Sequence, residues 1–170
     1  MKFQFYYEKL INSEEYQSFL KECPTAFPCS ALFIIDKEKN ENKVHFDYFI
    51  PGQEKIFSFD LSNGVDRIPI DNIDQIVPEK LGMNYTFDLA NYEKEIEKEI
   101  KKQEIKGTLQ KLLFSLQTKD KKPYLIITGF MSNLGLLKVS INLETSKIES
   151  FEKKSFFDLI RVVKGKKKKD

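Results

Sequence analysis

The residues whose type and spacing come nearest to a reactive site are four aspartates around the Asn63-Gly64 pair: Asp60, Asp66, Asp71 and Asp74. Grouped carboxylates bind Ca²⁺ or Mg²⁺, because hard cations prefer several oxygen ligands. The sequence from Asp60 does not match an EF-hand loop, because Val65 occupies the glycine position and an aspartate replaces the bidentate glutamate. Aspartates also collect at turns and helix caps, where they bond to the backbone. We therefore assign no metal and no cofactor, and keep a small metal-assisted hydrolase as an alternative.

His45 is the only histidine, so a catalytic triad or a zinc site would depend on it. Asp47, two residues on in an alternating run, could orient it, but no nearby serine or cysteine has the context of a nucleophile elbow. The glycine patterns of nucleotide-binding loops are also absent from the sequence. Cys23 and Cys29 flank a proline-bounded loop, and we expect two free thiols, with a redox pair as the alternative. We assign no catalytic residue and favour a protein that is not an enzyme.

Aromatic residues are numerous, with 15 Phe and 7 Tyr but no Trp. Solvent-facing aromatics on a sheet amid positive charge bind single-stranded nucleic acid, and Tyr6, Phe49 and Tyr124 are the candidates for such a platform. The charges beside them are mixed in sign, so we expect most aromatic side chains to lie in the core.

The C-terminus carries the segment with the most specific charge. Residues 161–170 hold six basic residues and one acidic residue, whereas the whole chain has a net charge of only +2, so the rest is slightly acidic. We predict one domain over residues 1–163 and a flexible lysine-rich tail over residues 164–170. Such a tail binds polyanions weakly and without sequence specificity. The candidate nucleic-acid-binding residues are Lys164, Lys166, Lys167, Lys168 and Lys169.

The bulk composition fits one globular domain: 170 residues, 41% of them hydrophobic, with 32% charged residues of nearly balanced sign. No apolar stretch is long enough to span a membrane, and the N-terminus lacks the apolar core of a secretory signal. We therefore expect a cytoplasmic protein without a membrane span.

The elements that must position these residues follow a helix-and-meander pattern. Alternation predicts strands over 3–7, 31–36, 44–50, 56–61, 65–70, 124–131, 137–143 and 148–151, with Asn63-Gly64 as a hairpin turn. A capping box at Asn12 opens one helix and Ser155 another, and apolar residues spaced by three to five predict a long helix from Asp88. Residues 31–50 and 124–143 align at an offset of 93, which indicates a repeated helix-then-meander pattern.

We predict an α+β fold in which a single domain has an antiparallel sheet of about six strands in two meanders, helices packed on one face, and a long central helix over residues 88–118. Because catalytic motifs are missing, we expect a non-enzymatic protein-binding module: an adaptor, an inhibitor or a chaperone-like subunit. A protein partner would contact the long helix or add a strand at a sheet edge, and homodimerisation is one option. The alternatives are a nucleic-acid-associated protein that uses the basic tail and the metal-assisted hydrolase.

Overall fold

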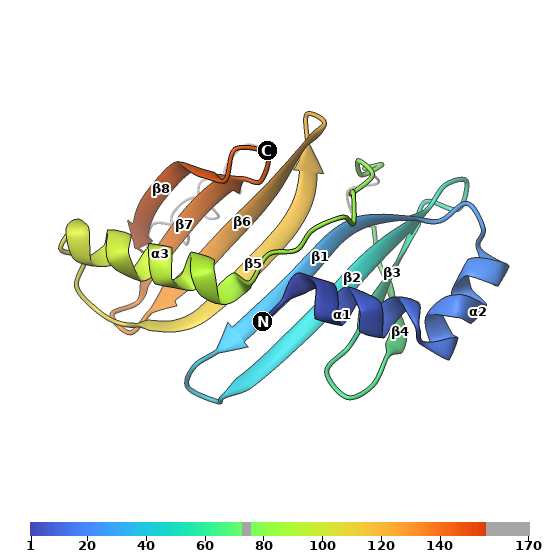
Figure 1. Ribbon diagram of the computed structural model, residues 1–170, viewed down its shortest axis with the longest axis horizontal. Helices are drawn as coiled ribbons and strands as arrows, with labels where there is room; N and C mark the ends of the chain where they lie inside the picture. Colours follow the sequence, from blue (N-terminus) through green and yellow to red (C-terminus); the bar gives the residue numbers. More distant parts are fainter. Residues whose placement is uncertain (73–75, 156–170) are drawn as a thin grey trace, which may run out of the picture.

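The computed structural model describes residues 1–72 and 76–155. Eight strands form one antiparallel sheet in the order β4-β3-β2-β1-β5-β6-β7-β8 (Figure 1). The three helices are α1 (Phe3–Ile11), α2 (Glu14–Glu22) and α3 (Leu89–Lys102). The strands are β1 (Phe27–Asp36), β2 (Glu41–Ile50), β3 (Lys55–Asp60), β4 (Asp66–Ile70), β5 (Leu109–Lys119), β6 (Lys122–Met131), β7 (Gly135–Asn142) and β8 (Lys147–Ser155).

The sheet consists of two four-strand meanders that meet at its centre. Strands β1 to β4 form the first meander after α1 and α2, and strands β5 to β8 form the second after α3. The two are joined because β1 pairs antiparallel with β5, with Phe33 opposite Phe114. We call this β1–β5 pairing the seam. It makes one continuous sheet out of two helix-and-meander units.

Strict alternation along β2 shows why these residues form a two-faced sheet. Val44, Phe46 and Tyr48 are buried on one side, whereas His45 and Asp47 point to the other. Successive side chains of a strand point to opposite faces, so such a run separates core from surface. The same separation holds across the seam into β5 and β6.

All three helices pack on one face of the sheet, and Figure 1 shows them on the same side. Their apolar side chains join the inward-facing strand residues in one core, in which Phe3, Phe19 and Leu89 are fully buried. The Tyr16 and Tyr48 hydroxyls, 2.9 Å apart, satisfy each other inside this core. The helices therefore leave the opposite face to other contacts.

The expected helix over residues 88–118 is wrong. Helix α3 ends at Lys102, and Gly107 follows with a φ of +100°, a conformation that favours glycine. Residues from Leu109 onward form β5 instead. The spacing of Leu109, Leu112 and Leu116 fits a helix, but a bulge between Leu109 and Lys111 produces the same spacing in a strand.

The sheet is also larger than predicted, with eight strands rather than about six, and 47% of the described residues are in strands against 21% in helices. The segment 3–7, expected as a strand, is the start of α1. The alignment of 31–50 with 124–143 is shifted by one strand. It matches β1 and β2 with β6 and β7, whereas by position in the meanders β1 and β2 correspond to β5 and β6. The helix expected after Ser155 and the boundary at 163/164 lie outside the described residues, and Ser155 itself ends β8.

Candidate functional site: the outer face of the sheet

The face of the sheet that points away from the three helices, here called the outer face, gathers residues from all eight strands. Its residues are those that alternate with the core positions. At the seam they are Leu32 and Ile34 from β1, and Leu113 and Ser115 from β5. In the part of the chain that the structure describes, no helix packs against these residues.

The centre of the outer face is apolar. Ile34 and Leu113 are cross-strand partners over the seam, and Leu32 and Ile126 both flank Ser115. We call Leu32, Ile34, Leu113 and Ile126 the apolar strip. All four are half-buried, and none of them belongs to the core on the helix side. Contiguous apolar surface of this kind is typical of interaction sites.

The strip separates two halves of opposite charge. The outer side of β1 to β4, here the acidic half, carries one lysine, Lys43, and five carboxylates: Asp36, Glu41, Asp47, Asp60 and Asp66. The outer side of β5 to β8, here the basic half, carries two carboxylates, Glu149 and Glu152, and six lysines: Lys111, Lys119, Lys122, Lys138, Lys147 and Lys154.

Some of these charged side chains already form ion pairs within the chain. Lys111 Nζ lies 3.5 Å from Asp36 Oδ2 across the seam, and Lys154 pairs with Glu152 at 2.9 Å. Burial disfavours the charged form of Asp60, but the hydroxyl and amide of Ser62 donate to it and outweigh that effect, so the pKa of Asp60 is lowered. Asp60 therefore keeps its negative charge at neutral pH.

Asp47 is a half-buried charge of the acidic half. Its Oδ2 accepts a hydrogen bond from the Ser30 hydroxyl, while its buried Oδ1 has no hydrogen-bond partner. On the basic half, a hollow of about 290 Å³ is lined by Lys119, Tyr124 and Lys138 among other residues. The outer face thus offers acidic groups on one side and a lysine-rimmed hollow on the other.

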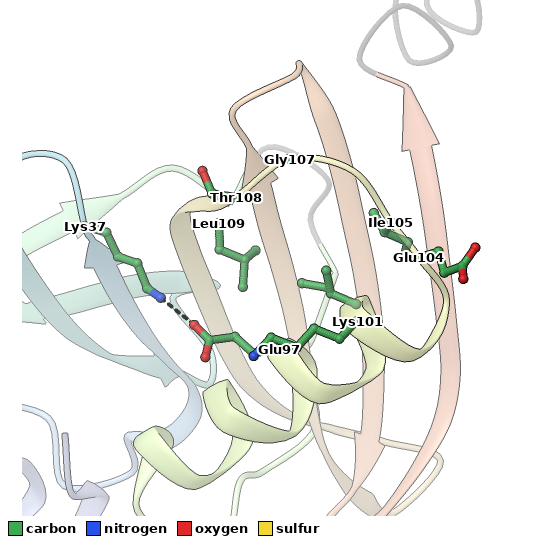
Figure 2. Close-up of a pocket in the computed structure, with 9 residues that line it drawn as sticks. Lys37, Glu97, Lys101, Glu104, Ile105, Gly107, Thr108 and Leu109 are labelled. Atoms are coloured by element: carbon green, nitrogen blue, oxygen red, sulfur yellow. Dashed lines mark hydrogen bonds and ion pairs between the residues drawn. The ribbon is translucent and has the colours of Figure 1, made fainter.

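A second candidate is a cavity of about 400 Å³ between the end of α3 and the start of β5 (Figure 2). Ile100, Ile105 and Leu109 give it apolar walls, and Lys37 reaches Glu97 with its Nζ 3.0 Å from Oε1. Burial disfavours the charged form of Lys37, but bonds to Glu93 and Glu97 outweigh it, and its pKa is raised. The charged residues that line the cavity are two lysines, Lys37 and Lys101, and two glutamates, Glu97 and Glu104, so the lining has no net charge that would select a ligand.

The described aspartates of the candidate group around Asn63-Gly64 are not all brought together. Asp60 and Asp66 are cross-strand partners on β3 and β4, but Asp71 follows the far end of β4. Asp74 lies outside the described residues. Within residues 1–72 and 76–155, no group of three or more His, Cys, Asp or Glu side chains could hold a metal ion. His45 lies opposite Asp60 rather than beside a nucleophile.

The aromatic candidates are not brought together. Tyr6 belongs to α1 on the helix side. Phe49 and Tyr124 lie on the outer face, but on β2 and β6, and Phe49 is buried against Phe27. Both cysteines are free thiols, and burial together with the Asp47 charge raises the pKa of Cys29 to about 12. The tail lysines, Lys164 and Lys166 to Lys169, lie outside the described residues.

The two edges of the sheet are not open templates for strand addition. On β4, Pro69 has no backbone N–H, and Arg67 is tied to α2 by ion pairs with Glu15 at 3.0 Å and Glu22 at 2.8 Å. On β8, exposed lysines and glutamates occupy most positions. Charges and prolines at edges oppose pairing with another strand. Binding of a partner by strand addition at a sheet edge therefore has less support than binding on the outer face.

Sequence reasoning missed the outer face because it assigned Leu113 to a helix. The signal was present, since Leu112, Phe114 and Leu116 alternate with Lys111, Leu113 and Ser115. Even with β5 recognised, the strip depends on the pairing of β1 with β5, which local patterns do not give.

Comparison with known proteins adds little to this geometry. The sequence matches no known protein family and no curated protein. Among solved structures, a candidate lipoprotein from Clostridium difficile 630 superposes with a TM-score of 0.49 at 12% identity, covering 83% of this chain and 91% of the other. No helix in the described ranges has the length and apolar character to cross a membrane. A likeness at that TM-score carries no argument, so the chain is assigned to no family.

Proposed function

We propose that this chain is a non-enzymatic protein-binding module that docks a partner protein on the outer face of its sheet. The observation that carries the proposal is the apolar strip between an acidic and a basic half, on a sheet whose helices cover only the other face. An apolar centre with a charged rim is the usual anatomy of a protein interface.

The proposal also implies a chemistry for the partner. A complementary surface has an apolar centre to cover Ile34 and Leu113, with basic groups toward β2 to β4 and acidic groups toward β6 to β8. Charge complementarity of this kind fixes orientation and excludes partners with the reverse pattern. An adaptor, an inhibitor or a chaperone-like subunit would each use such a surface.

Site-specific photo-crosslinking in the native cell lysate tests the proposal. A photoreactive amino acid replaces Ser115, at the centre of the outer face, or Phe5, which is 62% exposed on α1 on the opposite side of the sheet. We expect a protein adduct from position 115 and none from position 5. The adduct should disappear when Leu113→Lys is added, because a lysine there places an unpaired charge in the apolar strip.

Two results would count against the proposal. One is the same adducts from both positions, which indicates non-specific contact. The other is an adduct at position 115 that survives Leu113→Lys, which means that the apolar strip does not hold the partner.

A further inference from the structure

We infer that the partner on the outer face is a second copy of this chain, packed face to face about a two-fold axis that runs parallel to the strands. The inference rests on the proposed function and names its partner. It follows from the way the charges and the apolar strip are distributed about the seam.

The first argument is charge complementarity. Two sheets can meet face to face through a two-fold axis that is either parallel or perpendicular to the strands. The parallel axis exchanges the two meanders, so the acidic half of each copy covers the basic half of the other. The perpendicular axis would place acidic on acidic and basic on basic. Five carboxylates against one lysine on one half, and six lysines against two glutamates on the other, favour the parallel axis.

The second argument is the register at the centre. Strands β1 and β5 are the middle pair of the eight, so an axis over the seam places β1 of one copy on β5 of the other. Ile34 then covers the second copy's Leu113, and the reverse contact forms at the same time. Asp36 and Lys111 occupy the next outer positions on these strands, so they meet the second copy's lysine and aspartate in the same way.

The third argument is area. Strands β2, β1, β5 and β6 have ten or eleven residues each. At about 4.8 Å between strands and about 3.3 Å per residue, these four strands offer roughly 600 Å². The four outer strands add to it. A stable interface buries about 800 Å² per partner, so a face of this size is sufficient for a specific dimer.

Sedimentation velocity on the full chain over a concentration series tests the inference. We expect a reversible dimer of twice the 20.0 kDa chain mass. Leu113→Lys and Ile34→Glu, each at a half-buried outer-face position, should each weaken dimerisation by about tenfold or more. Phe5→Lys is the control, since it also replaces an apolar side chain with lysine but at a site that is 62% exposed on α1, on the opposite side of the sheet, and it should leave the dimer unchanged.

Mixing the two variants identifies the contact. In a heterodimer of Leu113→Lys with Ile34→Glu, one native contact between Ile34 and Leu113 remains, and the new lysine meets the new glutamate. We expect the equimolar mixture to dimerise at least about tenfold more tightly than either variant alone. Melting temperatures of the separate variants verify that each monomer is folded.

A chain that stays monomeric at all concentrations overturns the inference, and so does a dimer that neither variant weakens or that mixing fails to restore. The mass of the crosslinked adduct from position 115 separates this failure from that of the proposed function. An adduct with a different protein, lost on Leu113→Lys, rejects the second copy and retains the protein-binding module. No adduct and no dimer reject both.

Discussion

Cys29 illustrates how burial sets the chemistry of a single residue in this fold. It stands at the β-bulge in β1, where its Sγ lies 3.4 Å from the carbonyl oxygen of Asp47. Burial, and next the charge of Asp47, raise its pKa to about 12, so its thiol stays protonated at neutral pH. The thiolate is the reactive form, and a redox partnership with Cys23 is therefore disfavoured.

Alkylation of a Cys23→Ser variant measures this effect. At pH 8 we expect Cys29 in the folded chain to react roughly a hundredfold or more slowly than in urea, because only the thiolate reacts. The Cys29→Ser variant is the control, since its remaining thiol at position 23 is only half-buried. Equal rates for Cys29 in the folded and unfolded chains would contradict the buried position.

Residue-scale prediction from sequence succeeded where alternation is unambiguous. Val44, Phe46 and Tyr48 are buried as their spacing predicts, and Pro69 lies on an edge strand as expected. It could not foresee the Ser30–Asp47 hydrogen bond or the unpaired Asp47 oxygen, because both depend on the partner strand. The aspartates near Asn63-Gly64 were recognised as a group, but only Asp60 and Asp66 are adjacent among the described ones.

Among the elements, β5 decides the architecture, and its sequence is compatible with two periodicities. Leu109, Leu112 and Leu116 fall on one helical face, yet Leu112 and Leu116 also lie on one face of a strand. The strand forms because both of its faces pack in the sheet. Leu112 is fully buried under the helices, and Leu113 lies on the outer face. Tertiary burial thus overrides local spacing.

Alanine substitutions at these two neighbours test the strand. Leu112→Ala should lower the free energy of unfolding by about 2–5 kcal/mol, because it leaves a cavity in the core. Leu113→Ala should cost less than half as much, since that side chain is only half-buried on the outer face. Urea denaturation of both variants measures the difference. Similar losses at the two positions would contradict the alternation along β5.

For segment 3–7 the error was the reverse: a strand was predicted where the structure has a helix. Phe3, Phe5 and Tyr7 alternate as in a strand, yet the segment is helical and Phe5 is 62% exposed. Only Phe3 of the three is fully buried, beneath Phe33 and Phe46. Short apolar alternation does not separate the two structures when the neighbouring elements are unknown.

Taken as a whole molecule, the two meanders share one core across the seam. Phe33 is fully buried opposite Phe114 and contacts Phe3 of α1 and Phe46 of β2. Each unit therefore completes the other's core, and we expect the chain to unfold as one cooperative unit.

Calorimetry of a Phe33→Ala variant examines this coupling. The substitution should destabilise the chain by about 3–5 kcal/mol and still give a single transition, because the cavity lies where both meanders meet. Calorimetric and van't Hoff enthalpies should agree in both proteins. Two separate transitions would show that the meanders fold independently.

The candidate site depends on how the two meanders are joined in the whole molecule, which explains why the sequence alone could not locate it. Leu32 and Ile34 precede Leu113 and Ile126 by a whole helix-and-meander unit, and only the seam brings the two pairs together. The charge halves arise in the same way, since each meander contributes one sign. Net charge along the sequence does not show this arrangement.

The protected edges determine how far association can proceed. A sheet whose rims accept further strands can grow without limit into fibrils, as each added chain exposes a fresh rim. Here Pro69 and the Arg67 ion pairs occupy one rim, and charged side chains crowd the other. A two-fold dimer through the outer face would instead bury the surface that forms it, so association would stop at two copies.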